Sequence, residues 1–225
     1  MDAARVALLR QLLDGTEWVD RTQQFARSLR RSTKTPGGLL LVGTPEEEPW
    51  HFAAHLDDEA RYAGVPEMSP TLVRWAPPAG APPHLAIGLE RLEAAKRGES
   101  LLVVAPDVAP ETLLERVDDA RRIGATIFAL DGGNKELEGL AHEALVVPTT
   151  GLIVPDVTGV NQWTTTQSSS VQGLDTPEMS FDAVEHLVSL AAGENAENAS
   201  SRRGGLRDRL ARAIERISGP ASDAY

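Results

Sequence analysis

The sequence contains no cysteine in its 225 residues. This absence excludes disulfide bonds, cysteine-ligated zinc, iron–sulfur clusters and thiol nucleophiles. Basic residues are also scarce, because 22 lysines and arginines stand against 33 aspartates and glutamates and leave a net charge of −11. An acidic surface repels phosphate backbones, so we expect no nucleic acid among the partners of this protein.

Long hydrophobic runs are missing as well. The longest apolar stretches, such as residues 39–42 and 101–105, are far shorter than a bilayer requires. The first residues also lack a basic segment followed by an apolar run, which is the pattern of a signal peptide. We therefore expect a cytoplasmic protein that does not associate with membranes.

Short apolar segments alternate with amphipathic segments along the middle of the chain. Continuous apolar runs at 39–42 and 101–105 predict strands that are buried on both faces, and apolar residues at helical spacing predict helices. The other predicted strands are 72–75, 126–130 and 145–147, and the predicted helices are 3–14, 16–32, 49–63, 87–97, 110–123, 135–142 and 181–192. This alternation predicts an α/β fold, a three-layer sandwich whose mostly parallel sheet has about five strands.

The chain divides into four predicted regions. A helical lead-in at 1–35 precedes an α/β domain at 36–192, and a small polar linker at 193–205 leads to an amphipathic helix at 206–218. That last helix carries an apolar stripe beside several arginines. It could dock on an acidic protein partner, attach to a membrane surface or nucleic acid, or pack on the domain with its charged side in solvent, and we favour the local packing.

Several segments of the central domain carry a family resemblance. Gly43 follows the first predicted strand, where a glycine turn leads into a helix that ends in Gly-Val-Pro at 64–66. A helix and a Gly-Ala-Thr-Ile strand follow at 112–130, and a Leu-Ala helix with a closing strand follows at 136–148. The stretch from about residue 39 to 193 resembles the SIS (sugar isomerase) domain, the fold of many phosphosugar isomerases and phosphosugar-binding regulators. The resemblance implies binding sites in the strand-to-helix loops and across dimer contacts, so we expect a homodimer or a larger homo-oligomer.

The two loops that carry the chemistry of that family depart from its pattern. One is a loop rich in serine, threonine and glycine, which cradles the sugar phosphate at a helix N-terminus. The matching segment here, 105–112, lacks those serines and the glycine, has two prolines without N–H groups, and carries Asp107 and Glu111, so that Thr112 alone keeps a hydroxyl. The other loop carries three consecutive glutamates at 46–48, which repel a phosphate.

These departures lead us to expect a non-catalytic, SIS-like binding or assembly module, whose ligand, if one is kept, is a small carbohydrate derivative. Two alternatives stay open. One is a phosphosugar isomerase that interconverts aldoses and ketoses, with Glu185 or His186 as the general base; otherwise His186 packs on the sheet with a hydrogen-bonded ring. The other is an interaction scaffold that acts through its C-terminal helix.

Ligands of open α/β sheets bind at the carboxyl ends of the strands, so some of the candidate ligand-binding residues are those that follow predicted strands. The others lie in a long polar stretch at 151–173. Together, the candidates are Thr44, Asp107, Thr112, Asp131, Thr164 and Ser168. The hydroxyls of the polar stretch could bind a neutral sugar or a phosphate, although a solvated loop is the commoner outcome. Trp163 in that stretch anchors the loop or contacts a partner.

Two histidines share one face of a predicted helix, because His51 and His55 are four residues apart. With Glu47, Glu48 or Glu59 nearby, they could form a zinc or other divalent metal site. Alternatively, they are helix residues at the surface or at a dimer contact. A site needs three ligands and supporting partners, and the sequence has no HExxH motif, so we predict no metal and no cofactor.

Overall fold

The computed structural model describes residues 17–147 and 181–193 of the chain. Some of the predictions concern other residues and lie outside this part. They are the first helix at 3–14, the polar stretch at 151–173 with Trp163, Thr164 and Ser168, the linker at 193–205 after its first residue, and the C-terminal helix at 206–218.

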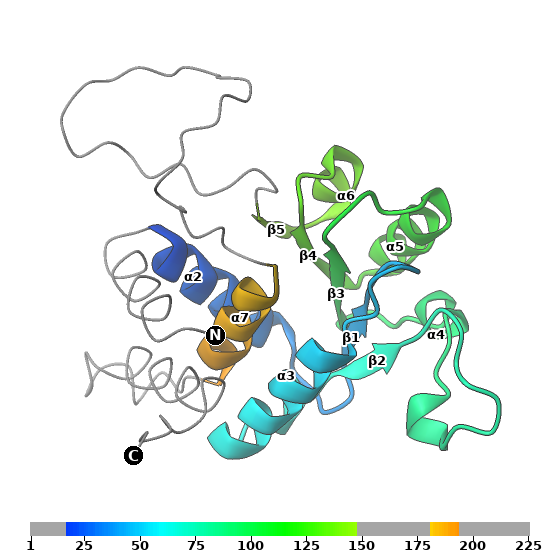
Figure 1. Ribbon diagram of the computed structural model, residues 1–225, viewed down its shortest axis with the longest axis horizontal. Helices are drawn as coiled ribbons and strands as arrows, with labels where there is room; N and C mark the ends of the chain where they lie inside the picture. The colour runs from blue at the N-terminus through cyan, green and yellow to red at the C-terminus, as the bar shows by residue number, and fades with distance from the viewer. Residues whose placement is uncertain (1–16, 148–180, 194–225) are drawn as a thin grey trace, which may run out of the picture.

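The described residues form a five-stranded sheet in the order β2-β1-β3-β4-β5, and each pair of neighbouring strands runs parallel. The strands are β1 (Leu39–Val42), β2 (Thr71–Val73), β3 (Ser100–Ala105), β4 (Thr126–Asp131) and β5 (Glu143–Val146). Across the centre of the sheet, the register pairs Leu41 with Leu102 and Leu102 with Phe128. The predicted α/β fold with a parallel sheet is confirmed (Figure 1).

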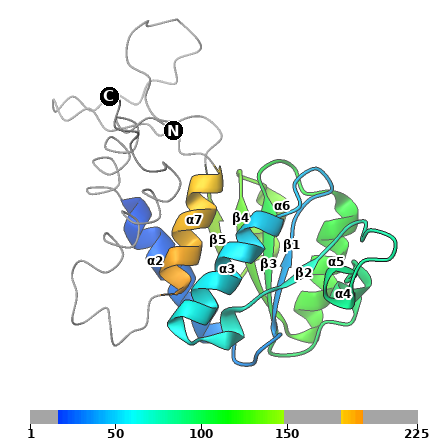
Figure 2. The same ribbon diagram turned by 60° about the horizontal axis from the view of Figure 1, so that its bottom comes forward.

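Helices cover both faces of the sheet (Figure 1). One face carries α2 (Glu17–Ser32), α3 (Trp50–Ala63) and α7 (Phe181–Ala192), and the other carries α4 (Glu90–Glu93), α5 (Glu111–Ile123) and α6 (Lys135–Leu140). Two short 3-10 helices, η1 (Pro66–Met68) and η2 (Pro83–Leu85), flank β2. Figure 2 shows α7 between α2 and α3, and it packs against both. No helix in the described ranges has the length and apolar character that a membrane crossing needs.

The strand side chains alternate between two hydrophobic cores. In β1, Leu39 and Leu41 pack in the core beneath α2, α3 and α7, whereas Leu40 and Val42 pack in the core beneath α4, α5 and α6. All four side chains are 0% exposed. A central strand of a covered parallel sheet is buried on both faces, which is why this run is apolar at every position.

Two contacts attach α2 to the rest of the domain. The ring of Phe25 in α2 meets that of Phe128 in β4 edge to face, with ring centroids 5.6 Å apart. The guanidinium of Arg30 donates a hydrogen bond to the carbonyl oxygen of Ala192, at the last turn of α7. A cation is favourable at a helix C-terminus, so Arg30 helps to hold α7 in place.

The predicted helix at 87–97 is wrong in length, because only Glu90–Glu93 is helical. The backbone N–H of Arg74 donates to the carbonyl of Ile87 at 2.8 Å, and Arg74 forms a β-bridge with Gly88. These pairings keep 87–88 extended beside the sheet. At the other end, the carboxylate of Glu99 accepts the backbone N–H of Lys96 at 2.8 Å and closes a turn.

Candidate functional site

The strand order places a topological switch point between β1 and β3. From β1 the chain continues to β2 at one edge of the sheet, whereas from β3 it builds toward β5 at the other edge. In open α/β sheets, ligands bind outside the carboxyl ends of the strands at such a point. The loops after β1 and β3, residues 43–49 and 106–110, border this switch point, and they carry the candidates Thr44 and Asp107.

The loop after β1 is fixed by its own hydrogen bonds. Thr44 is buried, and its hydroxyl oxygen accepts the backbone N–H of Glu47 at 3.1 Å. The indole N–H of Trp75 donates to the carbonyl oxygen of Gly43 at 2.8 Å. Thr44 therefore shapes the turn that starts α3, with its hydroxyl oxygen accepting a hydrogen bond within the loop.

The other candidates at this edge differ in exposure. Asp107 and Thr112 are exposed, one in the loop after β3 and one in the first turn of α5. Asp131, at the end of β4, is buried, and its Oδ1 accepts the backbone N–H groups of Gly133 and Asn134 at 2.7 and 2.8 Å. Burial raises the pKa of Asp131, while the two N–H donors act in the opposite direction. Asp131 therefore shapes the turn into α6 through Oδ1, whereas Asp107 and Thr112 are exposed at this edge.

Three histidines from two helices meet on the face of the sheet that carries α3 and α7. We name His51, His55 and His186 the three-histidine cluster; one ring nitrogen of each lies within 4.8 Å of those of the other two. The ring centroids of His51 and His55 are 4.8 Å apart, and those of His55 and His186 are 4.2 Å apart. His51 is exposed and the other two are half-buried. The side-by-side packing of α3 and α7 brings the third histidine to the other two (Figure 2).

The ring nitrogens of the cluster have different surroundings. Nδ1 of His186 lies 2.7 Å from the backbone carbonyl oxygen of Asp182. A carbonyl oxygen only accepts, so Nδ1 carries the proton and Nε2 keeps its lone pair in the neutral ring. Nε2 of His55 is buried and has no hydrogen-bond partner within the described part of the chain. Burial lowers the pKa of His55 and the positive charges of His186 and His51 act in the same direction, against the carboxylate of Asp58.

The two catalytic candidates lie in different surroundings although they are adjacent in sequence. His186 belongs to the three-histidine cluster, whereas Glu185 is only 8% exposed. Burial raises the pKa of Glu185 to about 8, and the negative charges of Asp182 and Glu47 act in the same direction. Glu185 therefore holds a proton at neutral pH, and its carboxyl group is packed in the protein rather than presented at the surface.

One exposed aromatic residue at this edge is not among the site residues that the sequence predicts. Trp50 is the first residue of α3, and its side chain is 62% exposed. Its ring centroid lies 5.1 Å from that of His51, so it borders the three-histidine cluster. Val108, within the loop after β3, is 82% exposed, so each of the two switch-point segments presents an exposed apolar side chain. The signal in the sequence is a tryptophan at the start of the helix that comes next after a buried strand and its loop.

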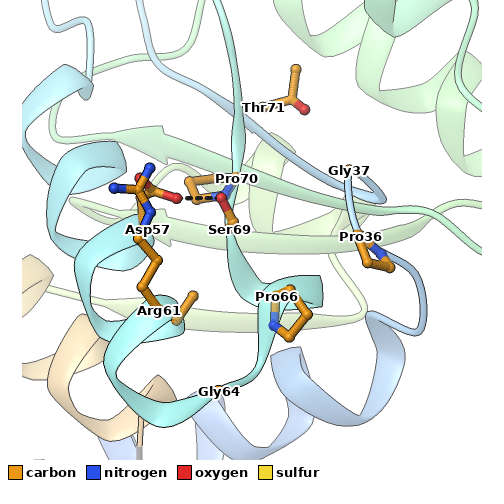
Figure 3. A pocket seen from close by; sticks show the side chains of 10 residues that line it. Pro36, Gly37, Asp57, Arg61, Gly64, Pro66, Ser69, Pro70 and Thr71 are labelled. Atoms are coloured by element: carbon orange, nitrogen blue, oxygen red, sulfur yellow. Dashed lines mark hydrogen bonds and ion pairs between the residues drawn. The ribbon is translucent and has the colours of Figure 1, made fainter.

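A hollow of about 520 Å³ lies at the opposite edge of the sheet (Figure 3). It lies where β1 and β2 begin, and the residues that line it include Pro36 and Thr71. On one wall, the hydroxyl of Ser69 donates to the carboxylate of Asp57, which also pairs with Arg61 at 2.6 Å. These polar groups satisfy one another, and the hollow is remote from the carboxyl ends where ligands of this architecture bind.

Comparison with known proteins finds likeness in structure alone. No family model matches the chain, and no curated protein matches it. A "Putative sugar binding protein" from Salmonella typhimurium LT2 matches with a TM-score of 0.52 and 12% identity, over 92% of this chain and 51% of that one. A "putative phosphosugar isomerase" from Silicibacter pomeroyi DSS-3 matches with a TM-score of 0.51 and 15% identity, over 93% of this chain and 52% of that one. The chain therefore spans about half the length of these two proteins and has their SIS-like fold.

Proposed function

We propose that this chain is a SIS-like module that binds a neutral carbohydrate derivative at the carboxyl edge of its sheet, where α3 begins. The exposed ring of Trp50 carries this proposal. A large aromatic side chain left 62% exposed at the switch point offers a flat apolar face beside the polar imidazole of His51. Sugars present apolar C–H faces together with hydroxyl groups, and such a ligand matches an aromatic face with polar groups around it.

The charge around Trp50 favours a neutral ligand over a phosphorylated one. Glu46 and Glu47 are exposed in the loop before α3, and Asp107 and Glu111 are exposed around the loop after β3. Helix α5 begins after Pro110, which has no N–H group to offer an anion and no side chain that caps the helix. Several carboxylates at close range oppose a phosphate group, because like charges repel.

The known structures support this proposal at the level of the ligand class. One of them is described as sugar binding and the other as a phosphosugar isomerase. In this chain, burial keeps Glu185, one of the two candidate bases, away from a ligand at the surface, which favours binding without turnover through this residue. Isomerase activity is an outcome that the following experiment distinguishes.

The test is calorimetric titration of the full chain with neutral sugars and with the corresponding phosphosugars. We expect binding of a neutral sugar, and we expect Trp50→Ala to weaken it at least about tenfold, the equivalent of 1.4 kcal/mol. Tyr62→Ala is the matched control, because Tyr62 is 77% exposed on the same helix but lies near its other end. Equal losses in the two variants, or no binding of any neutral sugar, would contradict the proposal. Binding and turnover of a phosphosugar would favour the isomerase.

The expected homodimer is part of the same proposal. The resemblance to the SIS domain implies binding sites across dimer contacts, so two copies of the chain would together complete such a site. We expect sedimentation equilibrium to give twice the mass of one chain. A single-chain mass at every concentration would contradict the proposed homodimer.

A further inference from the structure

We propose that the three-histidine cluster, His51, His55 and His186, is a binding site for a divalent transition-metal ion of the Zn²⁺ type. The sequence places His51 and His55 on one helix face, but it does not show three ligands with their supporting partners, which is why it predicts no metal. The packing of α7 against α3 supplies the third ligand. This inference goes beyond carbohydrate binding and is tested without any sugar.

The spacing of the three rings fits a metal ion after small side-chain rotations. Zn–N bonds of about 2.0–2.1 Å in tetrahedral geometry hold two ligand nitrogens about 3.4 Å apart. In the cluster, one nitrogen of each ring lies within 4.8 Å of those of the other two. Rotations about the side-chain bonds close this difference without moving the helices. Three protein ligands leave a coordination position for water or a bound ligand, as in catalytic zinc sites.

The hydrogen bonds around the rings leave suitable nitrogens for a metal. His186 uses Nδ1 on the carbonyl oxygen of Asp182 at 2.7 Å, which orients the ring and leaves the lone pair of Nε2 available for a metal. Metal-binding histidines commonly use their second nitrogen in this way. Nε2 of His55 is a buried polar atom that finds no partner in the described ranges. A buried nitrogen without a hydrogen bond costs free energy, and coordination of a cation would satisfy it.

The donor set selects the kind of ion. Three imidazole nitrogens suit Zn²⁺ and its neighbours among the divalent transition metals, whereas Mg²⁺ and Ca²⁺ prefer oxygen ligands. The carboxylate of Asp58 lies close enough to His55 to act on its charge. Negative charges around a neutral donor set favour the approach of a cation.

The first test is titration of chelator-stripped full-length protein, produced without a histidine tag, with Zn²⁺ and separately with Mg²⁺. We expect one Zn²⁺ per chain and no response to Mg²⁺. His51→Ala, His55→Ala and His186→Ala should each weaken Zn²⁺ binding at least about 100-fold, since loss of outer-shell partners alone costs 10–100-fold. His84→Ala is the matched control, because this exposed histidine lies in η2, away from the cluster.

Folding does not obscure the result, because His51 is exposed and its replacement leaves both cores intact. The melting temperature of each variant without metal shows whether the fold is preserved. Absence of Zn²⁺ binding, or an equal loss of affinity in the His84 variant, would overturn the assignment.

Hydrogen exchange distinguishes a three-histidine site from a surface site made by α3 alone. Zn²⁺ bound by all three residues joins α3 to α7, so we expect slower amide exchange in both helices when Zn²⁺ is present. This protection should disappear in His186→Ala. Protection limited to α3, unchanged in that variant, would show that His51 and His55 bind the ion without α7 and would overturn the proposal.

Discussion

Glu185→Gln is expected to stabilise the metal-free protein by about 3 kcal/mol at pH 8 while leaving its stability near pH 4 unchanged. The carboxyl group is 8% exposed, and burial raises its pKa from 4.5 to about 8. Each pKa unit is worth 1.36 kcal/mol, so about 5 kcal/mol is the upper limit of the cost of ionising this group in the fold. Glutamine has the shape of the neutral acid and cannot ionise.

The direction of the pH dependence follows from proton binding. Between pH 4.5 and about 8, the folded protein holds a proton on Glu185 that the unfolded chain has released. The free energy of unfolding therefore falls as the pH rises through this window, and the contribution of Glu185 is fully present only below it. Urea denaturation of chelator-treated protein at a series of pH values measures this fall, which should be much smaller in the variant.

A neighbouring carboxylate provides the control for this experiment. Asp182 is exposed and raises the pKa of Glu185 less than burial does. Asp182→Asn should therefore recover only a small part of the stability that Glu185→Gln recovers. If the Glu185 variant followed the wild-type protein at every pH, the carboxyl group would not be buried as the structure has it.

Gly43→Ala is expected to destabilise the protein by about 3 kcal/mol, at the upper end of what overpacking costs. A Cβ on Gly43 would lie 2.0 Å from the carbonyl oxygen of Glu47 and 2.5 Å from Cδ of Pro49. Both are part of the turn that starts α3, so the loop has to move to make room. Chemical denaturation measures the loss.

The same substitution tests whether the loop after β1 positions the site. Displacing the start of α3 would move His51 away from His186 on α7, so the affinity for Zn²⁺ should fall although no histidine is substituted. Gly139→Ala is the control, because Gly139 lies within α6 with open space around it, and alanine there should stabilise the protein by about 0.5–1 kcal/mol. Wild-type stability in Gly43→Ala would show that the close contact at this turn is easily relieved.

The sequence predicted best the elements whose pattern depends only on local burial. The apolar run of β1 and the amphipathic helix α7 have the predicted bounds, Leu39–Val42 and Phe181–Ala192. The helix predicted at 87–97 failed because the bridge between Arg74 and Gly88 is a contact between separate segments. The helical spacing of apolar residues within 87–97 contains no information about this contact with a distant segment.

The candidate site also has one part that the sequence predicts and another that it does not. The shared face of His51 and His55 follows from helix geometry and could be predicted from their spacing. That His186 joins them could not, because α7 reaches α3 only through the packing of both helices on one face of the sheet. Glu185 is buried and His186 is only half-buried, and this difference depends on which side of α7 packs against the rest of the domain.

The sequence by itself determined that this is an acidic, cysteine-free α/β chain with a parallel sheet, whose segment 105–112 lacks the serines and the glycine of the family's phosphate-binding loop. Each of these properties depends on composition or on residues close together in the chain. The tertiary structure alone decided which side chains share a site and which are buried. Contacts between distant segments determine both, and they create the three-histidine cluster, the raised pKa of Glu185 and the exposed ring of Trp50 beside His51.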